Sequence, residues 1–431
     1  VTRWQKFWAL ALYFNVVHAT VACYVCAGIG CVLNLNYTPP LLETPEGDFR
    51  PYCMILGSCG FFLSLMFAHD FPLVGKLCFR QSVFLDKVCI HQTDPALKAA
   101  GINNLGAFLR VSRKMLVLFS ALYFKKLWTV YEAACYMYMH PKENLKLVPV
   151  GLASVVLKSA VLTLMVHLSA LLINSLNETL RAGGSVLFSG NIGLLVGGGS
   201  CYIGLAFTLR GWALQHSELF EDLRSFEISK AACADERDRA VVGGNICTFV
   251  RAMGLVRDGG SDADALLSFN KLVQEQMPKL LRSATGPVGV PYQYTLVAGI
   301  GRDLFVLDEI SSAQDITVLE VSAILVHNFA IRFAAFPTIF WLASWLSNKC
   351  RPRKGWAEVV VTLAISVATL LITSLVFAAA DRLRVRAEES VWWLTVLVAA
   401  SAAEALVVAK LFAWRPSGVP AVAHWSNSTT G

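Results

Sequence analysis

The sequence predicts a mainly α-helical, polytopic membrane protein of about seven spans, with a small cytoplasmic α/β insert of βαβα order and a second, helical cytoplasmic segment. Composition is the first observation behind this class. The 431 residues are 55% hydrophobic and 16% charged, and their mean hydropathy is +0.55. Such a chain carries more apolar surface than one or two soluble cores can bury. The second observation is a series of apolar runs long enough to cross about 30 Å of hydrocarbon.

Seven apolar runs are the predicted spans. Six are long enough to cross without help from flanking residues, and they cover 7–33, 148–173, 185–209, 316–346, 356–380 and 391–414. The seventh, 53–68, is at the lower limit of length, so a re-entrant or core helix is the alternative there. The first run is too long for the apolar part of a signal peptide and lacks a small-residue cleavage site, so we interpret it as a span.

The charged flanks predict the orientation. Arg3 and Lys6 precede the first span, and residues 69–147 hold about twice as many Lys and Arg as Asp and Glu, which predicts a cytoplasmic location for both. Residues 34–52, residues 174–184 and the C-terminal tail then lie outside. The three glycosylation sequons of the chain all fall in these outside segments, at Asn36, Asn177 and Asn427.

One short loop disagrees with this orientation. Residues 348–354 form the most basic short loop of the chain, yet seven spans place it outside. Either the apolar run around Pro337 does not cross simply, or the charge rule fails at this loop. In both cases we expect an integral, multi-pass protein of the plasma membrane or an endomembrane, with a cytoplasmic N-terminus.

The spans divide the chain into six parts. These are 1–68 with two spans and an outside loop, 69–147 with the α/β insert, 148–209 with two spans, 210–315 with a mostly helical cytoplasmic segment, 316–414 with three spans, and 415–431 as a polar tail. The 210–315 segment is mildly acidic beside its basic neighbour, so we expect the two to dock. Apolar residues at helical spacing predict a helix over 263–281, ended by Gly286-Pro287.

The insert is predicted as strand, helix, strand, helix, over 82–90, 102–112, 115–120 and 127–139. Both strands are short, unbroken apolar runs, which is typical of strands covered on both faces and favours a parallel pair with a right-handed crossover. Ligands approach such a sheet at the carboxyl ends of its strands. The candidate binding residues at those ends are Asp86, Lys87, His91, Gln92, Ser120 and Tyr123.

Parts of this insert resemble Toll/interleukin-receptor (TIR) domains. Residues 112–132 read SRKMLVLFSALYFKKLWTVYE and are similar to the central TIR strand, which ends in Ser and leads into a Trp-x-x-x-Glu helix. Val83-Phe84-Leu85-Asp86 resembles the strand two positions earlier in that fold. Residues 84–94, with Leu127-Trp128 and Tyr131-Glu132, also resemble a large set of multi-span proteins, of unassigned function, from dinoflagellate-type protists.

The resemblance implies a chemistry for the insert. Catalytically active TIR domains use the Glu of that helix in NAD cleavage, and the matching position here is Glu132, with Trp128 as a further ligand-binding candidate. NAD is then a substrate, and no cofactor is expected. The alternative for Glu132 is a solvated helix residue near Lys125 and Lys126.

The resemblance covers only part of a TIR domain. The apolar run 53–68 takes the place of the first strand and its phosphate-near loop, and the chain returns to the bilayer soon after Met139. A two-stranded remnant exposes its edges and has little core of its own. We therefore expect the 210–315 segment, or a partner, to complete it.

Ionisable residues within the spans form a second candidate site. Burying a charge in lipid is costly, so such residues usually face a partner or a water-filled path. Glu320 and His327 are seven residues apart and share a helix face, so with Lys158 they are the predicted lining of a transport path. The alternative is that long side chains snorkel to the interfaces and His327 bonds within the bundle. The other candidates are His167, Arg332 and Glu404.

Several classes of site are not expected. Cys89 and His91 lack further ligands at metal-binding spacing, and the 12 Cys include no pair of Cys-x-x-Cys motifs, so we expect neither a metal site nor a disulfide framework. The net charge of +7 is concentrated in membrane-flanking loops, so the lipid bilayer, and not nucleic acid, is the expected partner.

Three functions fit these patterns. The preferred hypothesis is a multi-pass membrane protein whose degenerate TIR-like module acts in signalling or assembly without catalysis, by self-association or with TIR-like partners. The alternatives are a transporter or channel that uses the charged residues within its spans, and a TIR-type NAD nucleosidase.

Overall fold

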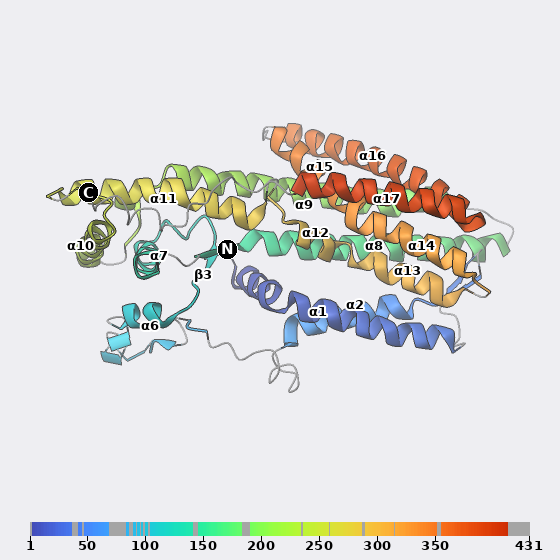
Figure 1. Ribbon diagram of the computed structural model, residues 1–431, viewed down its shortest axis with the longest axis horizontal. Coiled ribbons are helices and arrows are strands. Elements are labelled where there is room, and N and C mark those ends of the chain that lie inside the picture. Colours follow the sequence, from blue (N-terminus) through green and yellow to red (C-terminus); the bar gives the residue numbers. More distant parts are fainter. Residues whose placement is uncertain are drawn as a thin grey trace.

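The computed structural model describes most of the chain. The described residues are 2–36, 42–44, 47–68, 83–85, 104–140, 145–182, 190–233, 236–257, 259–286, 289–313, 315–350 and 355–412, with short pieces between 89 and 101. For 42–44, 47–49, 170–171, 173–182, 190–198 and 237 the description covers the backbone alone. The fold is mostly helical and consists of an elongated bundle of long helices with a smaller module at one end (Figure 1).

Five helical stretches of the described chain are long and apolar enough to cross a membrane, as expected of an integral membrane protein. They are α1 (Arg3–Leu35), the first part of α8 (Val150–Ala182), the joined α14 (Val318–Ala330), η3 (Ile331–Ala335) and α15 (Phe336–Lys349), α16 (Trp356–Glu389) and α17 (Val391–Phe412).

Two further helices belong to the bundle. The 16-residue α2 (Tyr52–Phe67) packs along α1 after an antiparallel hairpin of β1 (Leu42–Thr44) and β2 (Gly47–Phe49). The 35-residue α9 (Gly190–Arg224) packs along α8 and continues beyond the bundle into the module (Figure 1).

The main departure from the predicted layout is a broken helix inside the bundle. The helices α12 (Tyr292–Ala298) and α13 (Ile300–Ser312), which fall in the predicted cytoplasmic segment, instead pack on α1, α2 and α8. Their side chains Ala298, Ile300 and Leu304 lie in the bundle core. Four ionisable residues within 302–309 lower the hydropathy of this stretch, so the sequence does not mark it as a span.

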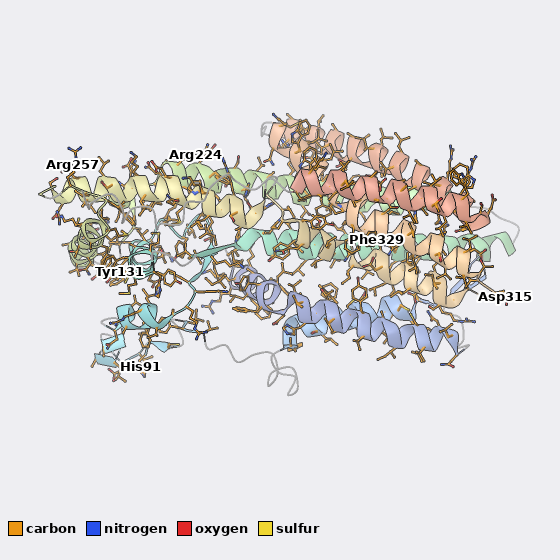
Figure 2. All side chains as sticks on the ribbon, in the orientation of Figure 1. His91, Tyr131, Arg224, Arg257, Asp315 and Phe329 are labelled. Carbon is orange, nitrogen blue, oxygen red and sulfur yellow. The ribbon has the colours of Figure 1, made fainter. Side chains whose placement is uncertain are left out.

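The broken helix changes the direction of every later helix. It carries the chain from the module end of the bundle to the opposite end, where Asp315 lies (Figure 2). As a result, α15 ends at Lys349 and α16 begins at Trp356, both at the module end of the bundle (Figure 1). The last helix, α17, also ends there, with the Phe412 ring 5.3 Å from that of Tyr292. The prediction of seven spans had instead placed residues 348–354 and the C-terminal tail outside, on the side opposite to residues 69–147.

The module contains a parallel strand pair, but not the predicted one. Strand β3 (Leu116–Phe119) pairs with β4 (Lys146–Pro149), in the register Leu116↔Lys146 to Phe119↔Pro149, and α7 (Leu127–Met139) connects them. Residues 83–85, within the first predicted strand, have no strand structure. Phe84 stacks instead on Phe108 of α6 (Leu105–Val111), with 4.5 Å between ring centroids. Because β4 runs directly into α8, the sheet is joined to the bundle without a linker.

Residues of the 69–147 and 210–315 segments share one hydrophobic core. Val130 and Tyr136 of α7 lie in it with Ile246 of α10 (Glu236–Ala252) and Phe269 of α11 (Asp262–Thr285). The short helix η2 (Ile228–Lys230) and the end of α9 complete this core. The expected docking of the two segments is therefore present, and it supplies the core that a two-stranded remnant lacks.

Replacing Phe269 by Ala is expected to lower the free energy of unfolding by about 3–5 kcal/mol, because the side chain is 1% exposed and its loss leaves a cavity in the shared core. Thermal unfolding of the detergent-solubilised protein measures this. The matched control is Leu267→Ala on the same helix, where the side chain is 68% exposed. Equal shifts for the two variants would contradict the shared core.

The junction of α9 and α11 is expected to weaken in acid. His216 bonds Thr285 Oγ1 at 3.0 Å, and burial, reinforced by the Arg282 charge, lowers the pKa of His216 to about 4. In the unfolded chain His216 therefore binds a proton near pH 6.5, whereas in the folded chain it stays neutral until the pH approaches 4. Stability is complete above pH 6.5 and falls by at most about 1.4 kcal/mol per pH unit as the pH approaches 4. Unfolding midpoints against pH measure this slope, which His216→Phe should reduce.

Candidate functional site

The broken helix brings charged side chains into the bundle. Arg302 and Glu309 are seven residues apart and lie on one face of α13, while Asp303 and Asp308 face other helices. Because a charge inside a low-dielectric bundle needs a partner, the partner of each charge shows what that charge does.

Asp303 is the centre of a buried polar network. Its Oδ2 forms an ion pair with Arg332 Nε at 2.9 Å and accepts a hydrogen bond from the Tyr24 hydroxyl. Its Oδ1 accepts a hydrogen bond from Asn328 Nδ2 at 3.1 Å. The side chains of Asp303 and Arg332 are 11% and 7% exposed. The network therefore ties α13 to α1, α14 and η3 with charge-assisted bonds that are largely shielded from solvent.

The backbone is irregular where these charges meet. Gly299 separates α12 from α13, and a Cβ at this position would lie 2.6 Å from Arg332 Nη1, so glycine allows the close approach. Arg332 itself lies in the π-helical turn η3 between α14 and α15. The Tyr292 hydroxyl donates to the Phe333 carbonyl in that turn at 2.8 Å. Interrupted helices and π-turns occur frequently at functional sites in helical membrane proteins.

Asp308 has a structural partner. Its carboxylate accepts hydrogen bonds from the backbone N–H groups of Cys53 (2.7 Å) and Met54 (2.9 Å) and from Asn34 Nδ2 (3.0 Å). The two backbone N–H groups lie in the first turn of α2, where no acceptor within the helix is available. Asp308, a residue of α13, therefore acts as the N-terminal cap of α2.

A cavity of about 520 Å³ lies on the other side of α13, between α8, α9, η3 and α16. Most of its wall is apolar, formed by side chains such as Leu162, Phe305 and Phe377. The charged or readily charged groups on the wall are His167, Arg302, His327 and Asp381, and the neutral polar groups are Thr163, Cys201, Tyr202 and Ser374. An apolar cavity with a few convergent polar groups is the usual form of a small-molecule site.

The two histidines of the cavity are held in place. His327 Nε2 lies 3.2 Å from Asp381 Oδ1, and the imidazole is 2% exposed. His167 Nδ1 bonds the Thr163 carbonyl at 2.8 Å, which leaves its Nε2 for other contacts, and its ring packs 5.1 Å from that of Phe305.

Arg302 is the cation of the cavity without a matching anion. Its guanidinium lies over the Phe305 ring at 5.7 Å, and its Nε has no hydrogen-bond partner. Glu309, on the same face of α13, lies 3.2 Å from Arg384 Nη1, which also lies 3.3 Å from Glu388, and Asp381 is bonded to His327. Within the described chain, therefore, Arg302 forms no direct ion pair, and the carboxylates of Glu309, Asp381 and Asp303 act on its charge from beyond ion-pair distance.

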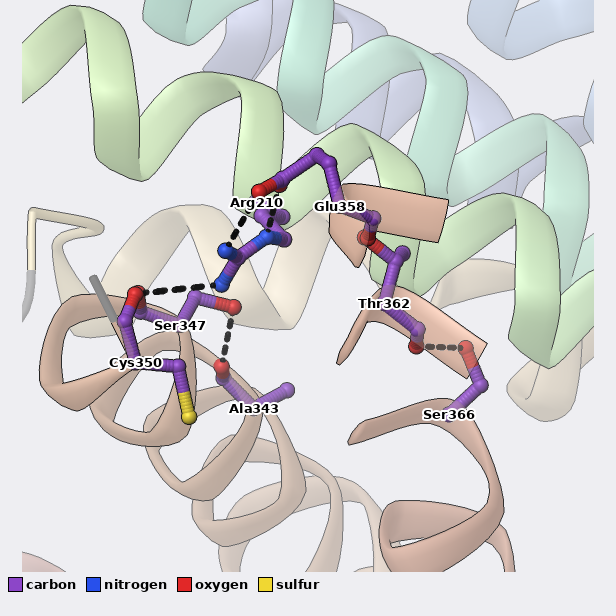
Figure 3. A network of polar contacts seen from close by, with 7 residues as sticks. All are labelled: Arg210, Ala343, Ser347, Cys350, Glu358, Thr362 and Ser366. Atoms are coloured by element: carbon purple, nitrogen blue, oxygen red, sulfur yellow. Dashed lines mark hydrogen bonds and ion pairs between the residues drawn. The ribbon is translucent and has the colours of Figure 1, made fainter. Parts of the chain in front are cut away.

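A further ion pair closes the bundle at the module end. Arg210 of α9, 2% exposed, forms a bidentate pair with Glu358 of α16, with 2.8 Å from Nη2 to Oε2, and its Nη1 donates to the Ser347 and Cys350 carbonyls of α15 (Figure 3). On α16, the buried Ser366 bonds back to the preceding turn. This network joins three helices and leaves no free charge for a ligand.

The predicted intramembrane residues separate into two groups. His167, His327 and Arg332 lie at the cavity or in the adjoining Asp303 network. The other three do not line the cavity: Glu320 caps the start of α14 through Thr317, and Lys158 and Glu404 are exposed on the outer surface of the bundle. Sequence reasoning missed Arg302, Asp303 and Asp381. Ionisable residues within the apolar stretch 292–312 were a usable signal for the first two, and Asp381 directly follows the predicted span 356–380.

The described TIR-like residues line neither of the two large cavities. Trp128 Nε1 donates to Asp238 of α10 at 3.1 Å, so it serves the docking of α7. Burial, followed by the nearby Glu132 carboxylate, raises the pKa of Tyr123, and Glu132 itself is half-buried. Neither described cavity includes these side chains or Ser120 at the end of β3.

Other predicted residues are exposed or not described. His91 lies at the exposed edge of the module (Figure 2), where its Nδ1 accepts from the Asp94 N–H at 2.9 Å. Asn36 is exposed at the end opposite the module, and Asn177 has only its backbone described. Outside the described residues lie Asp86, Lys87, Gln92 and Asn427. Among the residues that are described, no group of three His, Cys, Asp or Glu is arranged to hold a metal ion.

No family model matches the chain, and no curated protein or solved structure is significantly similar to it. The likeness of residues 82–139 to TIR domains therefore stays a prediction from the quoted motifs.

The Asp303–Arg332 pair is expected to carry much of the stability of the bundle. Asp303→Leu leaves Arg332 buried without an anion and should lower the free energy of unfolding by about 3–5 kcal/mol. Asp303→Leu with Arg332→Leu should recover much of that loss, because no unpaired charge remains. Thermal unfolding in detergent measures both, and a double variant no more stable than Asp303→Leu would contradict this account.

Proposed function

We propose that the protein is a membrane transporter for small organic anions that have an apolar body. The observation that carries the proposal is Arg302, a cation without an ion-pair partner in the described chain, on the wall of a largely apolar cavity. An unpaired charge inside a helical bundle is destabilising unless a ligand uses it, so its presence favours a binding role.

Three further features support transport. The cavity lies beside two interrupted helices, at Gly299 and at η3, which is where many transporters bind their substrates. The imidazoles of His167 and His327 add polar groups that can orient an acidic substrate. The apolar wall suits an aromatic or aliphatic body, and a volume of about 520 Å³ falls in the usual range for small-molecule sites.

The proposed orientation places the module in the cytoplasm. With α12 and α13 counted as one broken pass, the basic residues 348–354, Arg3 and Lys6 all flank the module end of the bundle, as the positive-inside rule favours. The hairpin end, with Asn36, then faces the outside.

Arg302→Gln is expected to reduce saturable uptake of the substrate by tenfold or more, since charge-assisted hydrogen bonds to an anion contribute about 1.5–3 kcal/mol. The measurement is uptake into proteoliposomes of a panel of labelled carboxylates with apolar bodies, such as benzoate, indole-acetate and octanoate. Lys158→Gln is the matched control, because it removes an exposed cation outside the cavity.

Thermal unfolding distinguishes a variant that has lost the binding site from one that has lost the fold. Arg302→Gln should unfold at a temperature equal to or above that of the wild type, because it removes a buried charge that lacks a partner. Equal uptake by wild type and Arg302→Gln, or no saturable uptake of any panel member, would overturn the proposal.

Signalling or assembly through the module is a second candidate, favoured by the continuous connection between module and bundle. Helix α9 carries Leu219 and Leu223 into the module core, and β4 passes into α8 at Val150. A change in the bundle therefore reaches the module through rigid elements. NAD cleavage by Glu132, with NAD as substrate, stays a prediction from the resemblance alone.

A further inference from the structure

A second cavity, of about 560 Å³, lies between α1 and the rest of the bundle. One face of α1, from Ala9 to Tyr24, forms one wall, and β4, α8, α12 and η3 form the other. At about 1.5 Å per residue this wall is roughly 22 Å long, which exceeds the thickness of one hydrocarbon leaflet. Ala9 and Leu12 are buried, whereas Val17 and Val21 are 67% and 59% exposed, so the groove has a closed floor and an open side.

The two ends of the groove are chemically different. Lys146 stands at the module end, with Nζ 5.0 Å from the centre of the Tyr13 ring, and it forms no ion pair in the described part of the chain. The exposed Arg3 and Lys6 belong to the same end of α1. At the inner end, the 7% exposed side chain of Arg332 lines the groove, and its Nη1 lacks a hydrogen-bond partner.

We infer that this groove binds an anionic phospholipid from the leaflet on the module side, with the headgroup, which carries a net negative charge, near Lys146 and one acyl chain along α1. Three observations favour this occupant. The open side is lined by the exposed Val17 and Val21, the wall between the two ends is mostly apolar, and all three cations at the outer end favour a negative headgroup. Basic residues beside the cytoplasmic membrane surface attract anionic lipid by about 1 kcal/mol each.

The groove also touches the junction of module and bundle. Its wall includes Leu147 and Val148 of β4 and Ala284 at the end of α11. A lipid in this position therefore contacts both parts of the protein at once, so its binding stabilises their observed arrangement. This role is independent of the Arg302 cavity, which lies on the other side of α13.

The test counts bound lipids by native mass spectrometry of the detergent-solubilised full chain, titrated with dioleoyl phosphatidylserine or dioleoyl phosphatidylcholine. The wild type is expected to retain phosphatidylserine more tightly than phosphatidylcholine. Lys146→Gln should weaken phosphatidylserine binding about fivefold, the equivalent of about 1 kcal/mol, and leave phosphatidylcholine unchanged. Val17→Trp, which fills the open side with a bulky ring, should weaken the binding of both lipids.

Lys158→Gln is the control, since it removes an exposed cation that does not line the groove, and it should bind both lipids as the wild type does. Unfolding midpoints confirm that each variant is folded. Equal retention of the two lipids by the wild type, or equal phosphatidylserine binding by wild type and Lys146→Gln, would overturn the inference and leave only non-specific surrounding lipid.

Discussion

The ion pair between Asp303 and Arg332 is the interaction on which the arrangement of the bundle depends. A helix with four ionisable residues in eight positions is a poor membrane span by hydropathy alone. It is stable between other helices because Asp303 is matched by Arg332, Tyr24 and Asn328, which come from three different elements. Fixing α13 in this place gives the chain an additional pass and therefore sets the direction of α14 to α17.

Helix α13 also supplies the one cation of the candidate site that has no direct ion pair in the described chain. Three of its charged side chains are bonded to protein groups, since Asp303 pairs with Arg332, Glu309 pairs with Arg384, and Asp308 accepts hydrogen bonds from the N–H groups of α2. Only Arg302 is left without such a partner in the described chain. Because all four belong to one rigid helix, the ligand proposed for Arg302 would also act on the packing of α13 against its neighbours.

The module depends on the bundle as much as on its own residues. Its two strands are too few for an independent sheet, and its core is completed by α9, α10 and α11. Strand β4 and helix α9 each belong to both parts of the molecule. The module is therefore better described as an extension of the helical bundle than as a separate domain joined by a linker.

The sequence by itself determined the features that depend on local composition and pattern. Long apolar runs identify the five candidate spans, periodic apolar residues ended by Gly286 identify α11, and the run ahead of Trp128 identifies β3 and α7. Only the tertiary structure decided the partner of β3. The sequence offers two short apolar runs, at 82–90 and 146–149, and β3 pairs with the second, which leads directly into α8. The tertiary structure also decided the place of α12 and α13. The physical reason is that a charged helix can be buried only beside complementary charges, and those of Arg332, Arg384 and the α2 amides lie far away in the sequence.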